Sequence, residues 1–280
     1  MAQDKYSAVW VSHSSMGDFL KCPRAYYLKN IYKNPKTGRK MGIVSPALSL
    51  GSAVHDVVEG LANYKAEERE AVPVFEQFDK VWKKFSGKKG GFSDIESENL
   101  SKERGIEMIK RVKDNMEPLL FKTVKLKGGK NDMPPNYFLS EEENIILCGK
   151  IDWLQYSEKD DSIHVLDFKT GKNEEDGESL QLPIYQLLLK NLQKRKVNGA
   201  SYWYLDKDNA PKAVDLPNVD ESYKKVFEVA KSVKKARENK EFDCPRGGAG
   251  CFACKPFEKI LKGEAEYIGL GDWQDLYFIP

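Results

Sequence analysis

Apolar runs separated by short polar segments predict strands in the middle of the chain. Residues 145–156 and 163–168 are mostly apolar or alternating, and the acidic segment 157–162 lies between them. Two such runs joined by a polar turn are typical of a β-hairpin. Further strands are predicted over residues 200–205, which are rich in aromatic side chains, and over residues 214–216.

Helical spacing of apolar residues predicts helices on both sides of these strands. The first helix begins with Ser14 or Ser15 as its N-cap and carries apolar residues at helical spacing from Met16 onward. Further helices are predicted over residues 52–65, 72–121 with a break at 86–92, 180–192 and 220–239. Residues 33–45 and 122–135 are predicted to be loops. This order of elements favours an α/β (α+β) fold in which helices flank a mixed central sheet.

The length and composition of the chain allow one large domain or a core with an inserted helical lobe. The chain has 280 residues, of which 40% are hydrophobic and 31% charged, and its formal net charge is +2. That charge does not require a polyanionic partner, but basic residues gather in short runs that are either solvated surface or nucleic-acid contacts. These runs lie at residues 83–84, 88–89, 122–130, 194–196 and 231–237.

The sequence favours a cytoplasmic location and gives no indication of a membrane partner. No apolar run is long enough to cross a bilayer, and the first residues lack a signal-peptide pattern. The chain has five cysteines, and this odd number argues against a disulfide framework in the cytoplasm. Metal binding then becomes the better explanation for several of them.

The predicted hairpin carries two acids and a lysine in positions that suit a metal site. Asp152 and Asp167 lie among apolar neighbours, where an ionised carboxylate is costly unless a cation pairs with it. Lys169 follows Asp167 by two residues, so alternation along a strand places both side chains on one face. Carboxylate oxygens bind hard metals such as magnesium, and the lysine can orient a water molecule or stabilise charge on a phosphate.

Two residue pairs at helical spacing allow more than one interpretation. His55 and Glu59 stand four residues apart and share a helix face, which favours a half-buried histidine hydrogen-bonded to Glu59 over a metal ligand. Gln181 and Tyr185 have the same spacing. These two side chains can hydrogen-bond a phosphate, a base edge or Lys169.

Three other chemically active residues stand apart from these patterns. Cys148 lies in an apolar run and is expected to pack in the core. His13 and His164 are isolated and are interpreted as structural. His164 precedes Asp167 by three residues, so it is expected on the opposite face of their strand.

Four segments, taken in order, resemble the motifs of the PD-(D/E)XK nucleases. They are LGSAVHDVVE at residues 50–59, GKID at 149–152, VLDFKTG at 165–171 and QLPIY at 181–185. The resemblance is to the RecB/AddB-like and CRISPR-associated exonuclease branch, which has a restriction-endonuclease-like fold. Each segment alone is a weak signal, but the four follow the family's order over most of the chain.

The resemblance implies a metal-dependent DNA nuclease, an exonuclease acting on single strands or DNA ends. The implied ligands of Mg²⁺ or Mn²⁺ are His55, Asp152, Asp167 and the carbonyl of Phe168. Lys169 would position the attacking water, Gln181 and Tyr185 would grip the strand, and Glu59 would stand beside the metal. The branch implies a role in DNA repair, recombination or CRISPR spacer processing, next to a separate helicase or CRISPR adaptation proteins.

Three cysteines gather in the C-terminal tail. Cys244, Cys251 and Cys254 flank a glycine-rich turn that lets backbone amides approach sulfur. A redox dithiol would need a thioredoxin-like context, which is absent, whereas zinc with three sulfurs and a distant fourth ligand suits the spacing. The resemblance instead implies a 4Fe–4S cluster held by these three cysteines and Cys22. The chain departs from the family at residues 260–262, where the final cysteine is missing and Cys244 would replace it.

We therefore expect one integrated nuclease domain with four parts. These are N-terminal helices over residues 1–70, a helical lobe over 71–135, the nuclease core over 136–217 and a C-terminal helix with the cysteine-rich segment over 218–280. The alternative is a non-catalytic nucleic-acid-binding or scaffold module with a structural metal cluster. The chain lacks a Gly-x-x-x-x-Gly-Lys-Ser/Thr loop, so an NTPase motor is not expected in it.

Overall fold

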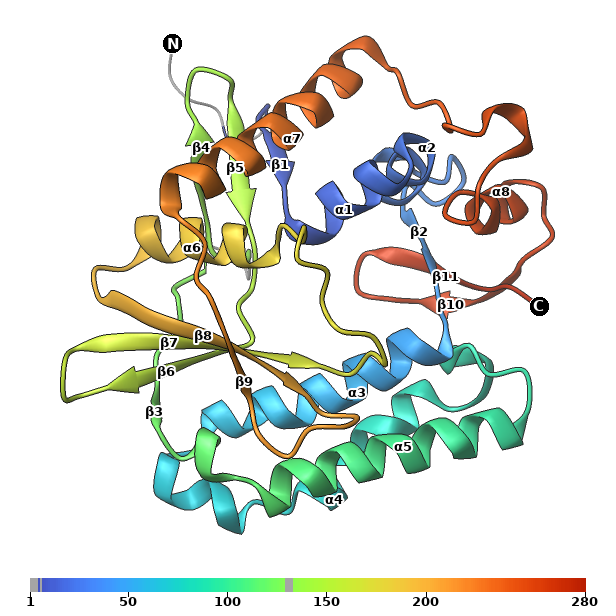
Figure 1. Cartoon of the computed structure of the whole chain (residues 1–280). Coiled ribbons are helices and arrows are strands. Elements are labelled where there is room, and N and C mark those ends of the chain that lie inside the picture. The colour runs from blue at the N-terminus through green and yellow to red at the C-terminus, as the bar shows by residue number, and fades with distance from the viewer. Residues whose placement is uncertain (1–4, 6, 129–132) are drawn as a thin grey trace.

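The computed structural model describes residues 5, 7–128 and 133–280, and a five-stranded mixed sheet lies at its centre (Figure 1). The strand order is β3-β6-β7-β8-β9. The bounds are β3 Lys122–Thr123, β6 Trp153–Ser157, β7 Ser162–Lys169, β8 Lys196–Tyr204 and β9 Lys212–Val214. Strand β7 pairs antiparallel with β6 and parallel with β8. The predicted mixed sheet is therefore confirmed.

Helices cover both faces of this sheet. The α-helices are α1 His13–Lys21, α2 Pro23–Tyr26, α3 Pro46–Gly60, α4 Val74–Trp82, α5 Ile95–Asp114, α6 Gln181–Leu192, α7 Val219–Asn239 and α8 Lys255–Leu261. One π-helix, η1 Tyr27–Ile31, continues α2. The 3₁₀ turns are η2 Leu61–Asn63, η3 Ala66–Ala71, η4 Lys83–Phe85, η5 Gly87–Gly90, η6 Glu117–Leu119 and η7 Gly247–Ala249. Among the described residues, no helix has the length and apolar character needed to cross a membrane.

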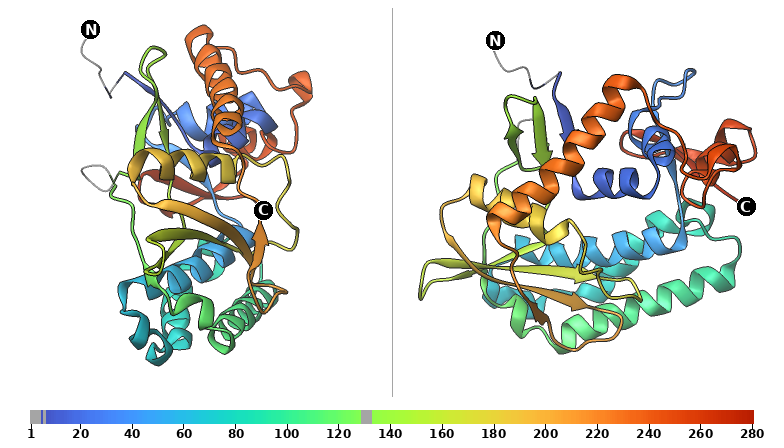
Figure 2. Two further views of the ribbon diagram at one scale, coloured as in Figure 1. Left: turned by 60° about the vertical axis from the view of Figure 1, so that its left-hand side comes forward. Right: turned by 45° about the horizontal axis from the view of Figure 1, so that its top comes forward.

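Side-chain alternation along β7 determines which helices cover which face of the sheet. Leu166 and Phe168 point into the main core, where Trp203 and the apolar faces of α3, α4 and α5 meet. Ile163 and Val165 point the other way and pack under α6. Figures 1 and 2 show the sheet between these two helical layers. Each such buried side chain stabilises the fold by roughly 1.5–3 kcal/mol.

Two smaller sheets complete the fold. The first has the order β1-β5-β4, and the second has the order β10-β11-β2. The bounds are β1 Val9–Val11, β4 Asn136–Ser140, β5 Ile145–Cys148, β2 Lys40–Ile43, β10 Glu266–Leu270 and β11 Gln274–Phe278. Strand β2 pairs parallel with β11, so the C-terminal end of the chain is tied to an N-terminal segment.

The predicted hairpin forms as β6 and β7, but its first strand is shorter than the apolar run. Residues 145–148 instead form β5 of another sheet, and the chain passes to β6 through residues 149–152. Gly149 suits this close passage, because a Cβ there would lie 3.0 Å from Leu188 Cδ1 of α6, which would then have to shift. The break leaves Asp152 just before β6 rather than within a strand.

Several predicted boundaries are wrong, and local capping or distant pairing explains them. The N-cap of α1 is Ser12, whose side chain accepts a hydrogen bond from the Ser15 amide. Helix α3 begins six residues earlier than predicted, after the N-cap Ser45. Strand β2 occupies the predicted loop 33–45, because it finds its partner in β11. Residues 129–132 of the predicted basic linker lie outside the described part of the chain.

His164 lies where it was expected, whereas Cys148, which was expected in the core, is only half-buried at the end of β5. His164 is on the face of β7 opposite Asp167, with its Nε2 2.9 Å from Ser201 Oγ. Cys148 is half-buried, and its Sγ lies 3.4 Å from the carbonyl oxygen of Val11. Neither residue joins a potential metal-binding group among the described residues.

Candidate active site and a four-cysteine group

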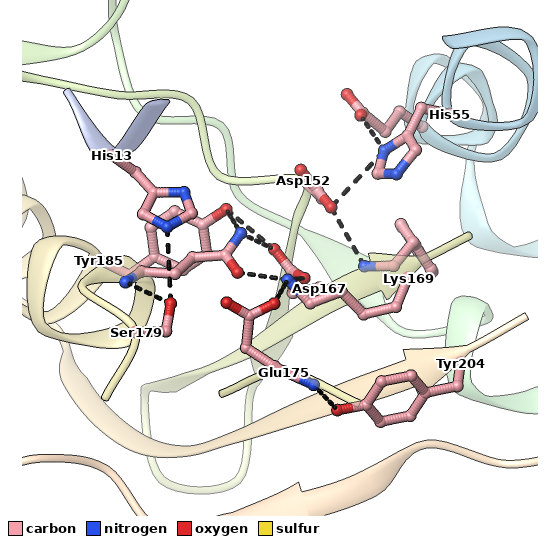
Figure 3. A network of polar contacts seen from close by, with 12 residues as sticks. His13, His55, Asp152, Asp167, Lys169, Glu175, Ser179, Tyr185 and Tyr204 are labelled. Carbon is pink, nitrogen blue, oxygen red and sulfur yellow. Dashed lines mark hydrogen bonds and ion pairs between the residues drawn. The ribbon is translucent and has the colours of Figure 1, made fainter. Parts of the chain in front are cut away.

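Strand β7 and helix α6 bring four of the predicted residues together. Asp167 and Lys169 lie near the end of β7, on the face that α6 covers. Gln181 and Tyr185 come from the first turns of α6, one turn apart. Figure 3 shows Tyr185 and Lys169 on either side of Asp167. Asp167 has only 1% of its surface exposed, so its charge must be compensated by neighbours.

The Asp167 carboxylate is held from both helix and strand. Its Oδ1 accepts hydrogen bonds from the Tyr185 hydroxyl at 2.9 Å and from Gln181 Nε2 at 2.8 Å. Its Oδ2 lies 2.9 Å from Lys169 Nζ and, that ion pair aside, has no hydrogen-bond partner among the described residues. Burial and the Asp167 charge raise the pKa of Tyr185 well above its usual value, so its hydroxyl keeps its proton and donates.

The Lys169 ammonium group has three acceptors, which equals the number of its N–H donors. Besides Asp167, it lies 2.9 Å from Glu175 Oε2 and donates to Gln181 Oε1. Glu175 belongs to the loop before α6, and its backbone N–H donates to the Tyr204 hydroxyl at 3.0 Å. Burial lowers the pKa of Lys169, but its ion pairs outweigh burial and leave that pKa raised. Lys169 is therefore a fixed cation.

A second polar group lies at the junction of α3 and the segment before β6. His55 Nδ1 is 2.9 Å from Glu59 Oε1 and 3.6 Å from Asp152 Oδ2. Lys150 Nζ lies 2.5 Å from Glu59 Oε2. The ligand-type atoms of His55, Glu59 and Asp152 all lie within 4.8 Å of one another. These three residues form what we call the oxygen–nitrogen group.

Asp152 links this group to β7. Its Oδ2 accepts a hydrogen bond at 3.1 Å from the backbone N–H of Phe168, the residue after Asp167. Burial and, second, the Asp167 charge raise the pKa of Asp152 to about 7. Burial lowers the pKa of His55, but Glu59 and Asp152 outweigh burial and raise it.

The donor set of the oxygen–nitrogen group fits a hard divalent cation. Imidazole nitrogen and carboxylate oxygen are ligands that Mg²⁺ or Mn²⁺ accepts, and a cation would stabilise the ionised form of the buried Asp152 carboxylate. Asp167 is not a member of the group, although its charge acts on both Asp152 and His55. Its Oδ2 is buried and lies 2.9 Å from Lys169 Nζ, so a metal ion at this oxygen would compete with the lysine.

Four cysteines form a separate group, far along the chain from the acids. The Sγ atoms of Cys22, Cys244, Cys251 and Cys254 lie within 4.8 Å of one another. Cys22 precedes α2 and Cys254 precedes α8, and Figure 1 shows these helices beside each other. All cysteines are free thiols, so the group is not a pair of disulfides. We call it the thiolate group.

Backbone amides point at sulfur in the thiolate group. The Ala25 N–H donates to Cys22 Sγ at 3.5 Å, and the Cys251 N–H donates to Cys254 Sγ at 3.2 Å. Burial raises the pKa of Cys22 to about 12, whereas hydrogen bonds from backbone amides lower that of Cys251 to about 6. Four sulfurs with amide donors fit a soft metal centre, either zinc or an iron–sulfur cluster.

The structure gathers the six predicted catalytic side chains in one neighbourhood. They are His55, Asp152, Asp167, Lys169, Gln181 and Tyr185. The part assigned to the Phe168 carbonyl stays a prediction, because only the amide of that residue has a described contact here.

Sequence reasoning missed three neighbours of the site. Lys150 lies beside Asp152 in the chain, and its place in the GKID segment was the only available signal. Glu175 lies in an acidic loop, and the sequence of a loop does not predict which of its acidic side chains points into the site. His13, interpreted as isolated, has its Nε2 3.5 Å from Ser179 Oγ at the start of α6 (Figure 3), and burial lowers its pKa.

Comparison with known proteins identifies the family. A family model described as the PD-(D/E)XK nuclease superfamily matches residues 10–256. Among solved structures, the chain is similar to a presumed exonuclease from Eubacterium rectale, with 14% identity, a TM-score of 0.48 and coverage of 91% of this chain and 92% of the other. A search of curated proteins found no match. The family model covers most of the chain, which therefore belongs to the PD-(D/E)XK nuclease superfamily.

Proposed function

We propose that this nuclease is a metal-dependent deoxyribonuclease that acts as an exonuclease on single-stranded DNA or DNA ends. The observation that carries the proposal is the placement of Asp167 and Lys169 at the end of β7, next to the oxygen–nitrogen group. We infer that the fixed cation and the metal-binding spot act on the same phosphate.

Each side chain has a proposed task. Lys169 holds the attacking water or a phosphate oxygen with one N–H, which requires one of its three acceptors to give way. Glu175 is the one to leave, because it is partly exposed and lies on a loop. Gln181 and Tyr185 are occupied by Asp167 and Lys169, so we propose that they orient this pair rather than grip the strand.

His55, Glu59 and Asp152 would hold the magnesium or manganese ion, with Asp167 close by. When bound, this ion supplies Lewis acidity and lowers the pKa of a bound water. Lys150 keeps Glu59 in place, and the Phe168 amide keeps Asp152 in place. Both contacts orient donor groups and so reduce the reorganisation that cation binding requires.

For the thiolate group we propose a 4Fe–4S cluster, with zinc as the alternative. Four mutually close sulfurs and two amide donors support either ion, and Cys244 takes the place of the cysteine missing at residues 260–262. Metal analysis of anaerobically purified protein and a visible absorbance spectrum decide between them. A broad brown absorbance with iron and sulfide supports the cluster, and colourless protein with one zinc overturns it.

The test of the main proposal is a digest of oligonucleotides labelled at the 5′ or 3′ end, single- and double-stranded, DNA and RNA. We expect magnesium- or manganese-dependent shortening of single-stranded DNA or of duplex ends. Protein that binds labelled DNA but never shortens it would instead support the non-catalytic alternative.

A further inference from the structure

We propose that the pocket next to the oxygen–nitrogen group holds the base of one unpaired nucleotide. The inference rests on the proposed function, because the phosphate attached to this nucleotide would lie at the metal-binding spot. It adds a binding subsite and the substrate class that the subsite selects, which is DNA with at least one unpaired nucleotide.

The pocket opens directly from the oxygen–nitrogen group. Its volume is about 510 Å³, and both Glu59 and Asp152 line it. One wall is the end of α3 with Gly60 and the following turn, and another is formed by residues 123–126 after β3. The Val124 amide donates to the Leu154 carbonyl at 3.0 Å, which fixes this second wall to the sheet. Residues 133–135 before β4 and residues 150–152 before β6 supply further lining.

The size and lining of the pocket suit a nucleobase. Pockets of roughly 300–1,000 Å³ hold one small molecule, and a single nucleotide is of that size. Half-buried or exposed apolar side chains line it, as they do in sites that take up an unstacked base. They are Ala62, Val124, Leu126, Met133, Pro134 and Ile151. A paired base cannot enter such a pocket, because its partner strand would have to enter with it.

The charges on the rim suit a phosphate once the metal is present. Among the described residues, the lining carries three carboxylates and two lysines, Lys125 and Lys150. A divalent cation held by Glu59 and Asp152 changes the net charge of this mouth from negative to positive. A nucleotide phosphate is then attracted to the mouth while its base enters the apolar part. Occupation of the pocket should therefore depend on the metal.

Gly60 offers a way to fill the pocket without touching a proposed ligand. It is in helical conformation, with φ −58° and ψ −27°, and a Cβ at this position would meet no atom within 4 Å. Gly60→Leu therefore places a side chain in the open space of the pocket. Gly17, a helical glycine of α1 whose Cβ would also be unobstructed, supplies the matched control Gly17→Leu.

The experiment measures binding of a fluorescent single-stranded oligonucleotide by anisotropy, with Ca²⁺ replacing Mg²⁺ to prevent turnover. Each protein is titrated with the intact strand and with strands carrying one abasic site at successive positions. For the wild type, one abasic position should weaken binding about tenfold, since packing of a base on protein contributes about 1–3 kcal/mol. Gly17→Leu should reproduce this loss at the same position.

Gly60→Leu should bind the intact strand about tenfold more weakly than the wild type and show no further loss with the abasic strand. The proposed subsite would be refuted if Gly60→Leu bound the intact strand as tightly as the wild type and still lost affinity for the abasic strand. Equal wild-type affinity for all strands would overturn it too. Wild-type protein that shows the abasic penalty but never cleaves with Mg²⁺ or Mn²⁺ would retain the subsite and refute the nuclease proposal, so the two failures are distinguishable.

Discussion

The thiolate group and the oxygen–nitrogen group are both sets of metal-binding side chains, but they are built in opposite ways. The thiolate group joins Cys22 to the tail, and in the described part of the chain the apolar residues packed with its cysteines are Ala25 and Ala253. The oxygen–nitrogen group sits on α3 and beside β6, against the main core. Residues of both groups line a pocket, but the first offers four protein ligands, which fill the coordination positions of a tetrahedral metal, whereas the second offers three and leaves positions open.

This difference indicates different tasks. A site closed by four protein ligands stabilises a fold, and a site with an open side is suited to chemistry. Around the oxygen–nitrogen group, the cations Lys150 and Lys169 are themselves fixed by carboxylates. Around the thiolate group, the polar support consists of backbone amides. Changes at the open site should therefore affect the rate of cleavage, and changes at the closed site should affect stability.

The largest expected effect is on the cleavage rate of Lys169→Met. Removal of a fixed cation from a developing charge reduces the rate per folded molecule by about 10²- to 10³-fold. Because Lys169 is the cation beside buried Asp167, the variant should also lower the free energy of unfolding, by up to about 3–5 kcal/mol. Initial rates on a labelled oligonucleotide and thermal unfolding measure the two quantities. Lys172→Met, on the exposed part of the following loop, is the control and should keep the wild-type rate.

At the closed site, Cys251→Ser should lower the free energy of unfolding by about 3 kcal/mol or more, because the binding free energy of the metal adds to folding. Cleavage per folded molecule should persist. Cys148→Ser is the control, since Cys148 lies outside the group, and it should cost less than about 1 kcal/mol. Denaturant unfolding and metal analysis test both variants. Equal losses in the free energy of unfolding for the two variants would contradict a structural role of the thiolate group.

A sharper test of the open site is Glu59→Gln. If Glu59 belongs to the metal-binding set, Mn²⁺ affinity should fall about 10- to 100-fold, as measured by calorimetry. Glu103→Gln, on the exposed surface of α5, should leave the affinity unchanged. An unchanged affinity in Glu59→Gln would restrict the set to His55 and Asp152.

The smallest expected effect concerns Glu175→Gln. In the proposed mechanism, the Glu175 carboxylate competes with phosphate for Lys169 Nζ. Its neutralisation should therefore lower the KM for DNA about fivefold with little change in kcat. A fivefold change corresponds to about 1 kcal/mol, which is typical of a partly exposed ion pair. Steady-state kinetics measure both constants. Glu174→Gln is the control, because Glu174 pairs with Lys207 and Lys212 instead. A fall in kcat would mean that Glu175 positions Lys169.

Local patterns predicted those parts of the site that lie on regular elements. Strand alternation placed Asp167 and Lys169 on one face, and the spacing of Gln181 and Tyr185 placed both on one side of α6. Glu175 could not be predicted, because a loop gives side chains no periodic direction.

Other parts of the fold could not be predicted from sequence, because they depend on pairing between distant segments. Strand β2 was predicted to be a loop and the β10–β11 hairpin was not foreseen, because their apolar patterns are short and their stability comes from each other. The parallel pairing of β2 with β11 joins opposite ends of the chain, which local sequence does not encode. Cys22 was connected to the tail only through the family resemblance, and no spacing rule would have linked it.

The most direct test of the account is a single-turnover cleavage of a labelled single strand by Asp167→Asn, saturated with Mg²⁺ or Mn²⁺. We expect no shortened product from this variant, while the metal content of its thiolate group equals that of the wild type. Cleavage by this variant at the wild-type rate would contradict the assignment of the active site to the end of β7.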